Sequence, residues 1–272
     1  MVNPRHLVAT GSWLVLLIAA PAWAGPYDLQ LGRLVMDGCS SACTQQRFDK
    51  LMTDLGFVLG PVYLSEASTL GLNGLEVSLE STIAALASDS ARWKLATRER
   101  GDPLLWVPRL RLRKGLPWSM EVGAQLSHLP DSALVVFGGE LKAALHEGFF
   151  LWPDLSFRAS LQRAVGAKDY SLTTWGWDLS ASKRFAIAGT LQIAPYLGYS
   201  MMFIQASSRV LVQPMEDTDL HTFSTLSWEK NLHSRAFVGC LLEVDWFQWA
   251  VEGIFSPDYF ALFNVKLGIR YP

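Results

Sequence analysis

Three histidines and one acidic cluster are the side chains in this chain best suited to acid–base chemistry. The cluster occupies 216–221, with the sequence EDTDLH, and ends in His221; His128 and His233 lie far from it in the sequence. Carboxylates and imidazoles serve general acid–base catalysis, and carboxylates also bind hard cations. A solvated surface loop has the same composition, so both interpretations of the cluster stay open.

Motifs for known reactions or cofactors are missing from the sequence. It contains no G-x-S-x-G, no H-E-x-x-H, no phosphate-binding loop and no G-x-G-x-x-G. We therefore expect no cofactor, no metal site and no enzymatic activity. An outer-membrane hydrolase or lipid-modifying enzyme that uses His128, His221 or His233 is the catalytic alternative.

The three cysteines are Cys39, Cys43 and Cys240. In an exported protein, a C-x-x-x-C pair can close a small disulfide loop, so Cys39 and Cys43 are a disulfide candidate, with two free thiols as the alternative. A metal site would need further ligands, and the histidines are distant. Cys240 lies in an apolar alternation and is interpreted as a packing residue.

Charged residues recur at every second position in several segments. Arg109, Arg111 and Arg113 alternate with Leu110 and Leu112, which is the period of a β-strand with one charged and one apolar face. The charged faces predict a lumen that is lined by Arg109, Arg111, Arg113, Glu121, Glu140, Lys142, Arg158, Asp178, Arg235, Glu243, Glu252, Lys266 and Arg270. Buried charges are costly unless paired, so we expect a network of salt bridges; an arginine ladder that selects anions is the alternative.

Composition limits the function classes. Half of the residues are apolar, only 18% are charged and the formal net charge is −2. This balance gives no broad attraction for nucleic acid.

The first 24 residues have the pattern of a signal peptide. Arg5 and His6 precede a short apolar run at 13–20, and Ala22-Trp23-Ala24 fits the small-x-small cleavage pattern. We expect export and cleavage after Ala24.

Residues 25–72 differ from the rest of the chain. Between Thr44 and Leu59, apolar residues recur every three or four positions, which predicts an amphipathic helix. Ser40, Ser41 or Thr44 are candidate caps, and Gly56 or Gly60-Pro61 candidate ends. We expect 25–72 to be a periplasmic segment whose helix either packs against the main domain or plugs a pore.

From residue 73 to residue 272 the period is two. About ten strands are predicted, with 8 or 12 as alternatives, and most are longer than ordinary globular strands. The two long connections, at about 87–103 and 205–230, both follow odd-numbered strands, so they share one end of an up-and-down structure. The sequence therefore predicts an all-β fold, an antiparallel transmembrane β-barrel with a short N-terminal helical segment.

Tryptophans support this prediction by their positions near strand ends. Trp118, Trp152 and Trp246 fall at one predicted end, and Trp93 and Trp106 at the other. Indole rings settle at membrane interfaces, so these residues are expected to form two girdles.

The last strand, 260–271, alternates Phe263, Val265, Leu267, Ile269 and Tyr271 with mostly polar residues, and Pro272 ends the sequence. It resembles the C-terminal recognition strand of bacterial outer-membrane β-barrel proteins, in which an aromatic residue usually comes last. The resemblance implies a bacterial outer-membrane location, contact with outer-membrane lipid and insertion by the outer-membrane assembly machinery.

The expected function is a structural, surface-interaction or narrow-pore transport role, because about ten strands enclose little space and the charges inside are balanced. A soluble secreted ligand-binding β-barrel is a further alternative. That alternative would place the apolar faces inward.

Overall fold

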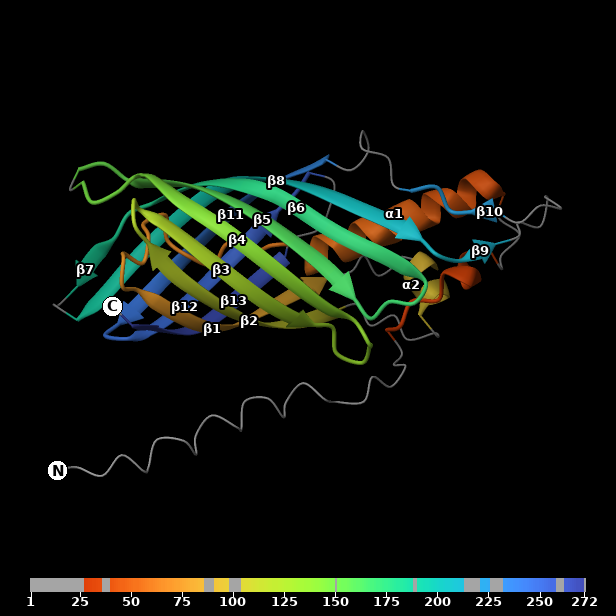
Figure 1. Cartoon of the computed structure of the whole chain (residues 1–272), viewed down its shortest axis with the longest axis horizontal. Coiled ribbons are helices and arrows are strands. Elements are labelled where there is room, and N and C mark those ends of the chain that lie inside the picture. The colour runs from red at the N-terminus through yellow and green to blue at the C-terminus, as the bar shows by residue number, and fades with distance from the viewer. Residues whose placement is uncertain are drawn as a thin grey trace, which may run out of the picture.

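A computed structural model describes residues 27–35, 40–85, 91–97, 104–149, 151–187, 190–212, 221–225, 232–257 and 262–271. Within these ranges, ten long strands form one antiparallel sheet that closes on itself into a barrel (Figure 1). The predicted fold class is confirmed.

The barrel strands have the following bounds: β1 Leu75–Ala85, β2 Leu104–Leu116, β3 Met120–His128, β4 Val135–His146, β5 Asp154–Val165, β6 Tyr170–Ser182, β8 Leu191–Ser208, β11 Leu232–Val244, β12 Phe247–Phe255 and β13 Leu262–Tyr271. Each pairs with its neighbours in this order, and β13 pairs with β1 to close the barrel, with Leu79 opposite Leu267. Short strands absent from the prediction lie in the connections: β7 Phe185–Ile187 extends the sheet beside β8, and β9 Leu211–Val212 pairs with β10 His221–Thr222.

The two ends of the barrel differ. The short-turn end carries the β2–β3, β4–β5, β6–β8 and β11–β12 connections, together with the start of β1 and the end of β13. The long-connection end carries the β1–β2 and β8–β11 connections, which are the two longest. The predicted alternation of long and short connections is therefore present.

Burial along the strands is inside-out relative to a soluble barrel. Leu79 is 62% exposed and Leu110 44% exposed on the outer face, while the inward Glu80 and Arg109 are 4% and 2% exposed. Leu112, Val122 and Val265 also lie on the outer face. A soluble barrel with an apolar interior would have apolar side chains inside and charged side chains outside. Hydrocarbon around the barrel explains the observed pattern of apolar side chains outside and charged side chains inside.

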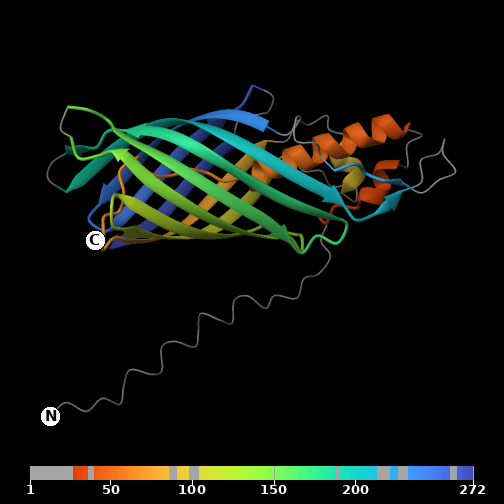
Figure 2. The same ribbon diagram turned by 45° about the horizontal axis from the view of Figure 1, so that its top comes forward.

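Two helices and a 3₁₀ turn cover the long-connection end (Figure 2): η1 Leu31–Val35, α1 Ser41–Leu59 and α2 Ala91–Ala96. The Ser40 hydroxyl accepts a hydrogen bond from the backbone N–H of Cys43 at 3.4 Å and so caps α1. Gly60 leaves the helical conformation before Pro61, which disfavours a helical residue in front of it. No helix within the described ranges is both long and apolar enough to cross a membrane.

These helical elements, which we call the cap, have their own buried contacts. The indole Nε1 of Trp93 in α2 donates to Asp54 Oδ2 in α1 at 2.9 Å, and both residues are buried. Phe48 of α1 stacks on Phe223 with ring centroids 4.8 Å apart. Trp93 therefore joins α1 to α2, and its expected place in an interfacial girdle is wrong. Trp118 and Trp152 are strongly exposed at the short-turn end.

Candidate functional site: a plugged lumen

The chain passes through its own barrel. After α1 ends at Leu59, residues 60–74, which we call the plug segment, run inside the sheet to the start of β1 at the short-turn end (Figure 1). Residues 60–67 are all buried. The plug segment forms neither a helix nor a strand. A few of its peptide groups find partners within the segment, such as the Gly74 N–H, which donates to the Gly71 carbonyl oxygen at 3.1 Å. Because buried peptide groups need hydrogen bonds, the barrel wall supplies partners for many of the others.

Six cations from the wall donate to backbone carbonyl oxygens at the end of α1 and along the plug segment. They come from β2, β4, β5, β11 and β13 and so surround the segment. Their contacts are Arg109 Nη2 to Val58 at 2.7 Å, Arg235 Nη2 to Pro61 at 2.6 Å, Arg158 Nη1 to Val62 at 2.7 Å, Arg111 Nη2 to Val62 at 2.9 Å and Nη1 to Tyr63 at 3.1 Å, Lys266 Nζ to Leu64 at 3.3 Å, and Lys142 Nζ to Glu66 and to Ser68, each at 3.1 Å.

Wall oxygens accept from the amides of the same segment. Glu252 takes two consecutive N–H groups, from Tyr63 at 3.3 Å and from Leu64 at 2.8 Å. The other acceptors are Ser182 Oγ for Ala67 at 2.8 Å, Glu147 Oε2 for Thr69 at 2.8 Å and Glu121 Oε2 for Leu70 at 3.3 Å. The wall therefore binds both polar groups of the plug backbone.

The wall cations also pair with wall acids. Arg158 contacts Asp178 at 2.6 Å and Glu140 at 2.8 Å, and Arg111 contacts Glu80 at 3.1 Å. Further pairs join Arg113 to Glu76 and to Glu121, Lys142 to Glu121, Lys266 to Glu76, and Arg270 to Glu243. Arg270 also pairs with Glu66 of the plug segment. The predicted network of paired charges is present. Several of its cations also have further N–H groups, which donate to the backbone carbonyl oxygens of the plug segment.

Tyr63 anchors the middle of the plug segment. Its ring stacks on Phe237 with centroids 4.9 Å apart, and the Arg158 guanidinium lies 4.8 Å from the ring centroid. Its hydroxyl shares hydrogen bonds with Ser156 at 2.8 Å and with Ser180 at 2.5 Å. A buried tyrosine combines a large apolar contact area with a hydroxyl group that has hydrogen-bond partners. The ring contacts and the hydroxyl hydrogen bonds of Tyr63 therefore hold the plug segment against the barrel wall.

At the short-turn end, the plug segment meets exposed turns. Glu147, in the β4–β5 turn, accepts from the backbone N–H and the hydroxyl of Thr69. Partial burial raises the pKa of Glu147, but hydrogen bonds from Ser119 and Thr69 and the charge of Lys142 outweigh it and hold the pKa below its usual value. Arg184 pairs with Glu66 of the plug segment; burial lowers the pKa of Arg184, and the Glu66 carboxylate outweighs this effect and raises it.

All thirteen residues of the predicted lumen set lie on inward strand faces. Ten of them are buried: Arg109, Arg111, Arg113, Glu121, Lys142, Arg158, Asp178, Arg235, Glu252 and Lys266. Glu140, Glu243 and Arg270 are partly exposed. Glu66, Glu147 and Arg184 join the network but were not in the predicted set. They lie outside the long strands, where a period of two gives no signal.

The other candidate residues are dispersed. His233 lies in the lumen edge-on to Phe57, and His128 lies at the end of β3, where its Nδ1 is 3.1 Å from the carbonyl oxygen of Leu134. Residues 216–220 lie outside the described ranges. Cys43 is disulfide-bonded and Cys240 carries a free thiol, while Cys39 is outside the described ranges. No group of three or more potential metal ligands occurs among the described residues.

The barrel is similar to solved barrels of the bacterial outer membrane. A KdgM porin aligns with 72% of this chain and 98% of its own length at 11% identity, with a TM-score of 0.32. Ail of Yersinia pestis aligns over 74% and 99% at 12% identity and TM-score 0.26, and Omp33 of Acinetobacter baumannii over 73% and 98% at 8% and 0.29. No protein-family model and no curated protein matches the chain. The likeness concerns the fold alone.

Proposed function

We propose that this chain is an integral β-barrel of the bacterial outer membrane whose lumen its own N-terminal segment keeps closed, and whose role is structural or surface interaction. The observation that carries the proposal is the binding of the plug backbone by five wall cations and by Glu252, Glu147 and Glu121, with Arg109 holding the end of α1 beside it. A segment held in this way along its length obstructs diffusion, so the cap at the long-connection end becomes the part available to partners.

The proposal includes export, with residues 1–24 removed, and insertion by the outer-membrane assembly machinery into outer-membrane lipid. Outer-membrane barrels have short periplasmic turns and long outer connections. This rule puts the long-connection end, and with it α1, at the cell surface. A cell-surface position of α1 is incompatible with the expectation that the whole of 25–72 is periplasmic. The reason is that α1 lies at the end of the barrel opposite to the short turns (Figure 2). We therefore propose a surface-exposed cap.

Planar-bilayer conductance of the full chain tests whether the plug closes the lumen. We expect no steady current from the wild type and frequent openings from Arg158→Met with Arg111→Met, because these changes remove donors to Val62 and Tyr63. Arg113→Met is the matched control, since Arg113 pairs with the wall acids Glu76 and Glu121. A steady wild-type current, or equal openings in the control, contradicts the proposal.

A narrow pore that opens when the plug segment moves is the second candidate. The wall cations that hold the segment already have acid partners beside them, as Arg158 has Asp178 and Glu140. If the plug segment left the lumen, these wall cations would therefore still be paired with acids. This pairing lowers the free energy needed to open the lumen. Openings of the wild type under applied voltage, abolished when an engineered disulfide holds the plug segment to the wall, would favour this candidate.

We propose that the protein is not an enzyme. His128 and His233 lie on different strands, and each contacts a carbonyl oxygen or an aromatic ring as described above. Lipid or peptide hydrolysis by the purified barrel that alanine at His128, His221 or His233 abolishes would contradict this.

A further inference from the structure

The outer face of the barrel carries very few charges. Among the described residues of the ten long strands, the only outward-facing Lys, Arg, Asp or Glu side chains are Lys114, near the short-turn end, and Arg163, near the long-connection end. Lys114 donates to the backbone carbonyl oxygen of Asn73 at 2.8 Å, whereas the Arg163 side chain has no hydrogen bond or ion pair with any described residue. A cation on the lipid-facing side is costly at the middle of the membrane but not at its interface, so the depth of Arg163 decides what it does.

Arg163 lies in a row of polar side chains that crosses three strands. It pairs with Thr173 of β6, which in turn pairs with Gln205 of β8. The next outward pair toward the cap is Ser171 with Ser207, whose hydroxyl groups hydrogen-bond to each other at 2.6 Å. Each of these five residues directly follows a buried, inward-facing residue, so all five face outward. The outer face is therefore polar on this side of the long-connection end.

An aromatic pair marks the border of the apolar wall just below the polar row. Trp175 of β6 stacks on Phe203 of β8 with ring centroids 4.1 Å apart, one outward position nearer the middle of the wall. The outward residues of β8 from this level to the short-turn end are apolar or aromatic: Phe203, Met201, Tyr199, Leu197, Pro195, Ile193 and Leu191.

The length of this apolar stretch places the polar row at the level of lipid headgroups. About twelve residues at about 3.3 Å each, tilted by about 40°, span about 30 Å along the membrane normal. That is the thickness of the hydrocarbon core, and the headgroup region lies directly outside it. Arg163 and Gln205 lie about 5 Å further out than the aromatic pair, by the same rise and tilt.

Two further cations lie at the same rim. Lys168 is in the β5–β6 turn, and Arg209 directly follows β8; the backbone N–H of Arg209 donates to the Asp169 carbonyl oxygen at 2.7 Å and so holds the two elements together. Both side chains are exposed and, like Arg163, have no ion pair with a described residue. The carboxylate of Asp169, next to Lys168, accepts from the backbone N–H of Leu31 in the cap. We call Arg163, Lys168 and Arg209 the basic rim.

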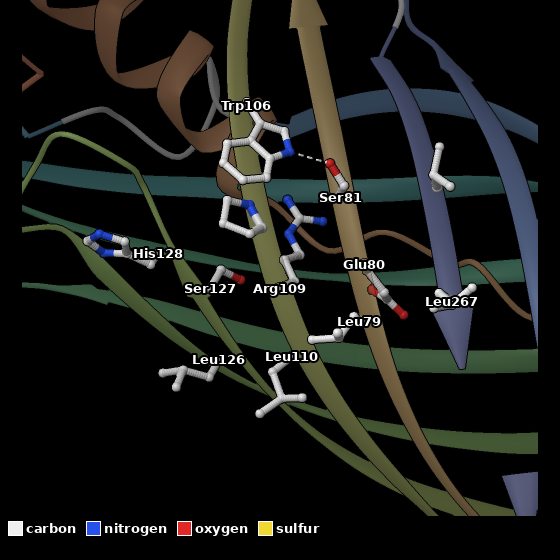
Figure 3. Close-up of a pocket in the computed structure, with 12 residues that line it drawn as sticks. Leu79, Glu80, Ser81, Trp106, Arg109, Leu110, Leu126, Ser127, His128 and Leu267 are labelled. Atoms are coloured by element: carbon white, nitrogen blue, oxygen red, sulfur yellow. Dashed lines mark hydrogen bonds between the residues drawn. The ribbon is translucent and has the colours of Figure 1, made fainter. Parts of the chain in front are cut away.

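The opposite side of the barrel has no such arrangement among its described residues. On β1 and β2, the outward residues near the long-connection end are Ile83, Leu104 and Trp106, and the one polar side chain, Ser81, accepts from Trp106 Nε1 at 2.5 Å (Figure 3). Arg109 of β2 faces the lumen instead, where it donates to Val58. Since both sides of a barrel meet the same membrane, the basic rim is a local feature and not a general property of this end.

We propose that the outer face of β5, β6 and β8 at the long-connection end binds an anionic lipid, with the basic rim on its phosphate. Thr173 and Gln205 lie between the cations as hydrogen-bond donors, and Trp175 and Phe203 contact the start of the acyl chains. Guanidinium and ammonium groups both bind phosphate, and each cation near the membrane surface adds to the attraction for anionic headgroups. The inference rests on the proposed insertion of the barrel in a membrane.

Photo-crosslinking of the full chain in phosphatidylcholine vesicles tests the proposal. The probe is a small fraction of phosphatidylglycerol with a diazirine near the glycerol end of one acyl chain. We expect cross-links on 173–175 and 203–207 to exceed those on 83–85 and 104–106 several-fold, and a phosphatidylcholine with the same diazirine to label both sides equally. The same ratio with the two lipids would overturn the site. No cross-links anywhere would show that the chain is not in the bilayer and would contradict the proposed function as well.

Matched pairs of charge-removing variants test the basic rim itself. Arg163→Gln combined with Arg209→Gln should reduce the enrichment to the phosphatidylcholine value. Lys50→Gln combined with Lys94→Gln removes the same charge from exposed positions of the cap and should leave the enrichment unchanged. All four positions are exposed, so the barrel should fold in both variants. An equal fall in the two variants would assign the effect to net charge and overturn the site.

Inorganic phosphate separates a lipid site from a site for free phosphate. Salt screens exposed charges, so sodium phosphate and sodium chloride at equal ionic strength should lower the enrichment equally. A much larger fall in phosphate would make the free anion the ligand and would overturn the assignment to a lipid.

Discussion

The carboxylate Oε2 of Glu252 accepts a hydrogen bond from the backbone N–H of Leu64 at 2.8 Å, and the other oxygen, Oε1, accepts from the backbone N–H of Tyr63. One wall carboxylate therefore binds two consecutive amides of the plug segment. Glu252→Gln keeps the size but replaces one acceptor oxygen with an NH₂ donor. We expect the plug segment to lose about 1.5–3 kcal/mol of stabilisation, the range for a hydrogen bond to a charged group. Hydrogen exchange of residues 62–65 measures the change, and unchanged protection would contradict it.

Gly56 brings α1 against β8. A Cβ at this position would lie 2.6 Å from Ile204 Cγ2, closer than real contacts allow. We expect Gly56→Ala to destabilise the packing of α1 in the wild type by about 1–3 kcal/mol through overpacking. In an Ile204→Ala background the space is free, and the same change should stabilise by about 0.5–1 kcal/mol through helix propensity. Thermal unfolding of the four variants measures both values, and the same sign in both backgrounds would refute the contact.

Acid should loosen the short-turn end of the plug segment through Glu147. Its pKa is lowered in the folded protein, so its contribution to stability is present above the unfolded value of 4.5 and is lost as the pH falls below it. Protonation removes the negative acceptor for the N–H of Thr69. We expect hydrogen-exchange protection at residues 69–70, corrected for intrinsic rates, to fall with pH in the wild type.

Glu147→Gln is the control for this pH effect, because its amide does not titrate. The variant should show weaker protection at neutral pH and little further loss in acid. A wild-type-like pH profile in the variant would assign the effect to another group.

Surface labelling tests the proposed orientation of the barrel. In a Cys240→Ala background, Lys50→Cys places a thiol on the exposed side of α1, and Trp118→Cys places one at the short-turn end. A membrane-impermeant maleimide should label the first but not the second in intact cells, and both after lysis. Labelling in the reverse order would put α1 in the periplasm.

The strands and the cap helix could be predicted from the sequence for simple physical reasons. A barrel wall with lipid on one side and charged groups on the other requires apolar and charged residues to alternate along each strand. The alternation of Arg109, Arg111 and Arg113 with leucines therefore predicted the inward face of β2. The helix was also recognisable, because its apolar spacing and the Gly60-Pro61 end are local signals. The observed α1, Ser41–Leu59, ends at Gly60-Pro61, one of the two ends that the sequence predicted.

The path of the plug segment could not be predicted. Its only charged side chain is Glu66, and the groups that hold it are mainly backbone carbonyls, which every residue has. Sequence reasoning therefore paired Arg111 and Arg158 with acids but gave no reason to place Val62 between them. Trp93 was misplaced for a related reason: its partner Asp54 lies in a different helix, and only tertiary packing brings the two together.

The seam between β1 and β13 also constrains how the molecule can be built. The first and last strands of the barrel meet there, so the cylinder can be completed only after β13 has been made. Because the segment in the lumen is continuous with β1 and ends in a helical cap, we expect it to be enclosed as the sheet curls around it. Late threading would require pulling α1 through a finished cylinder.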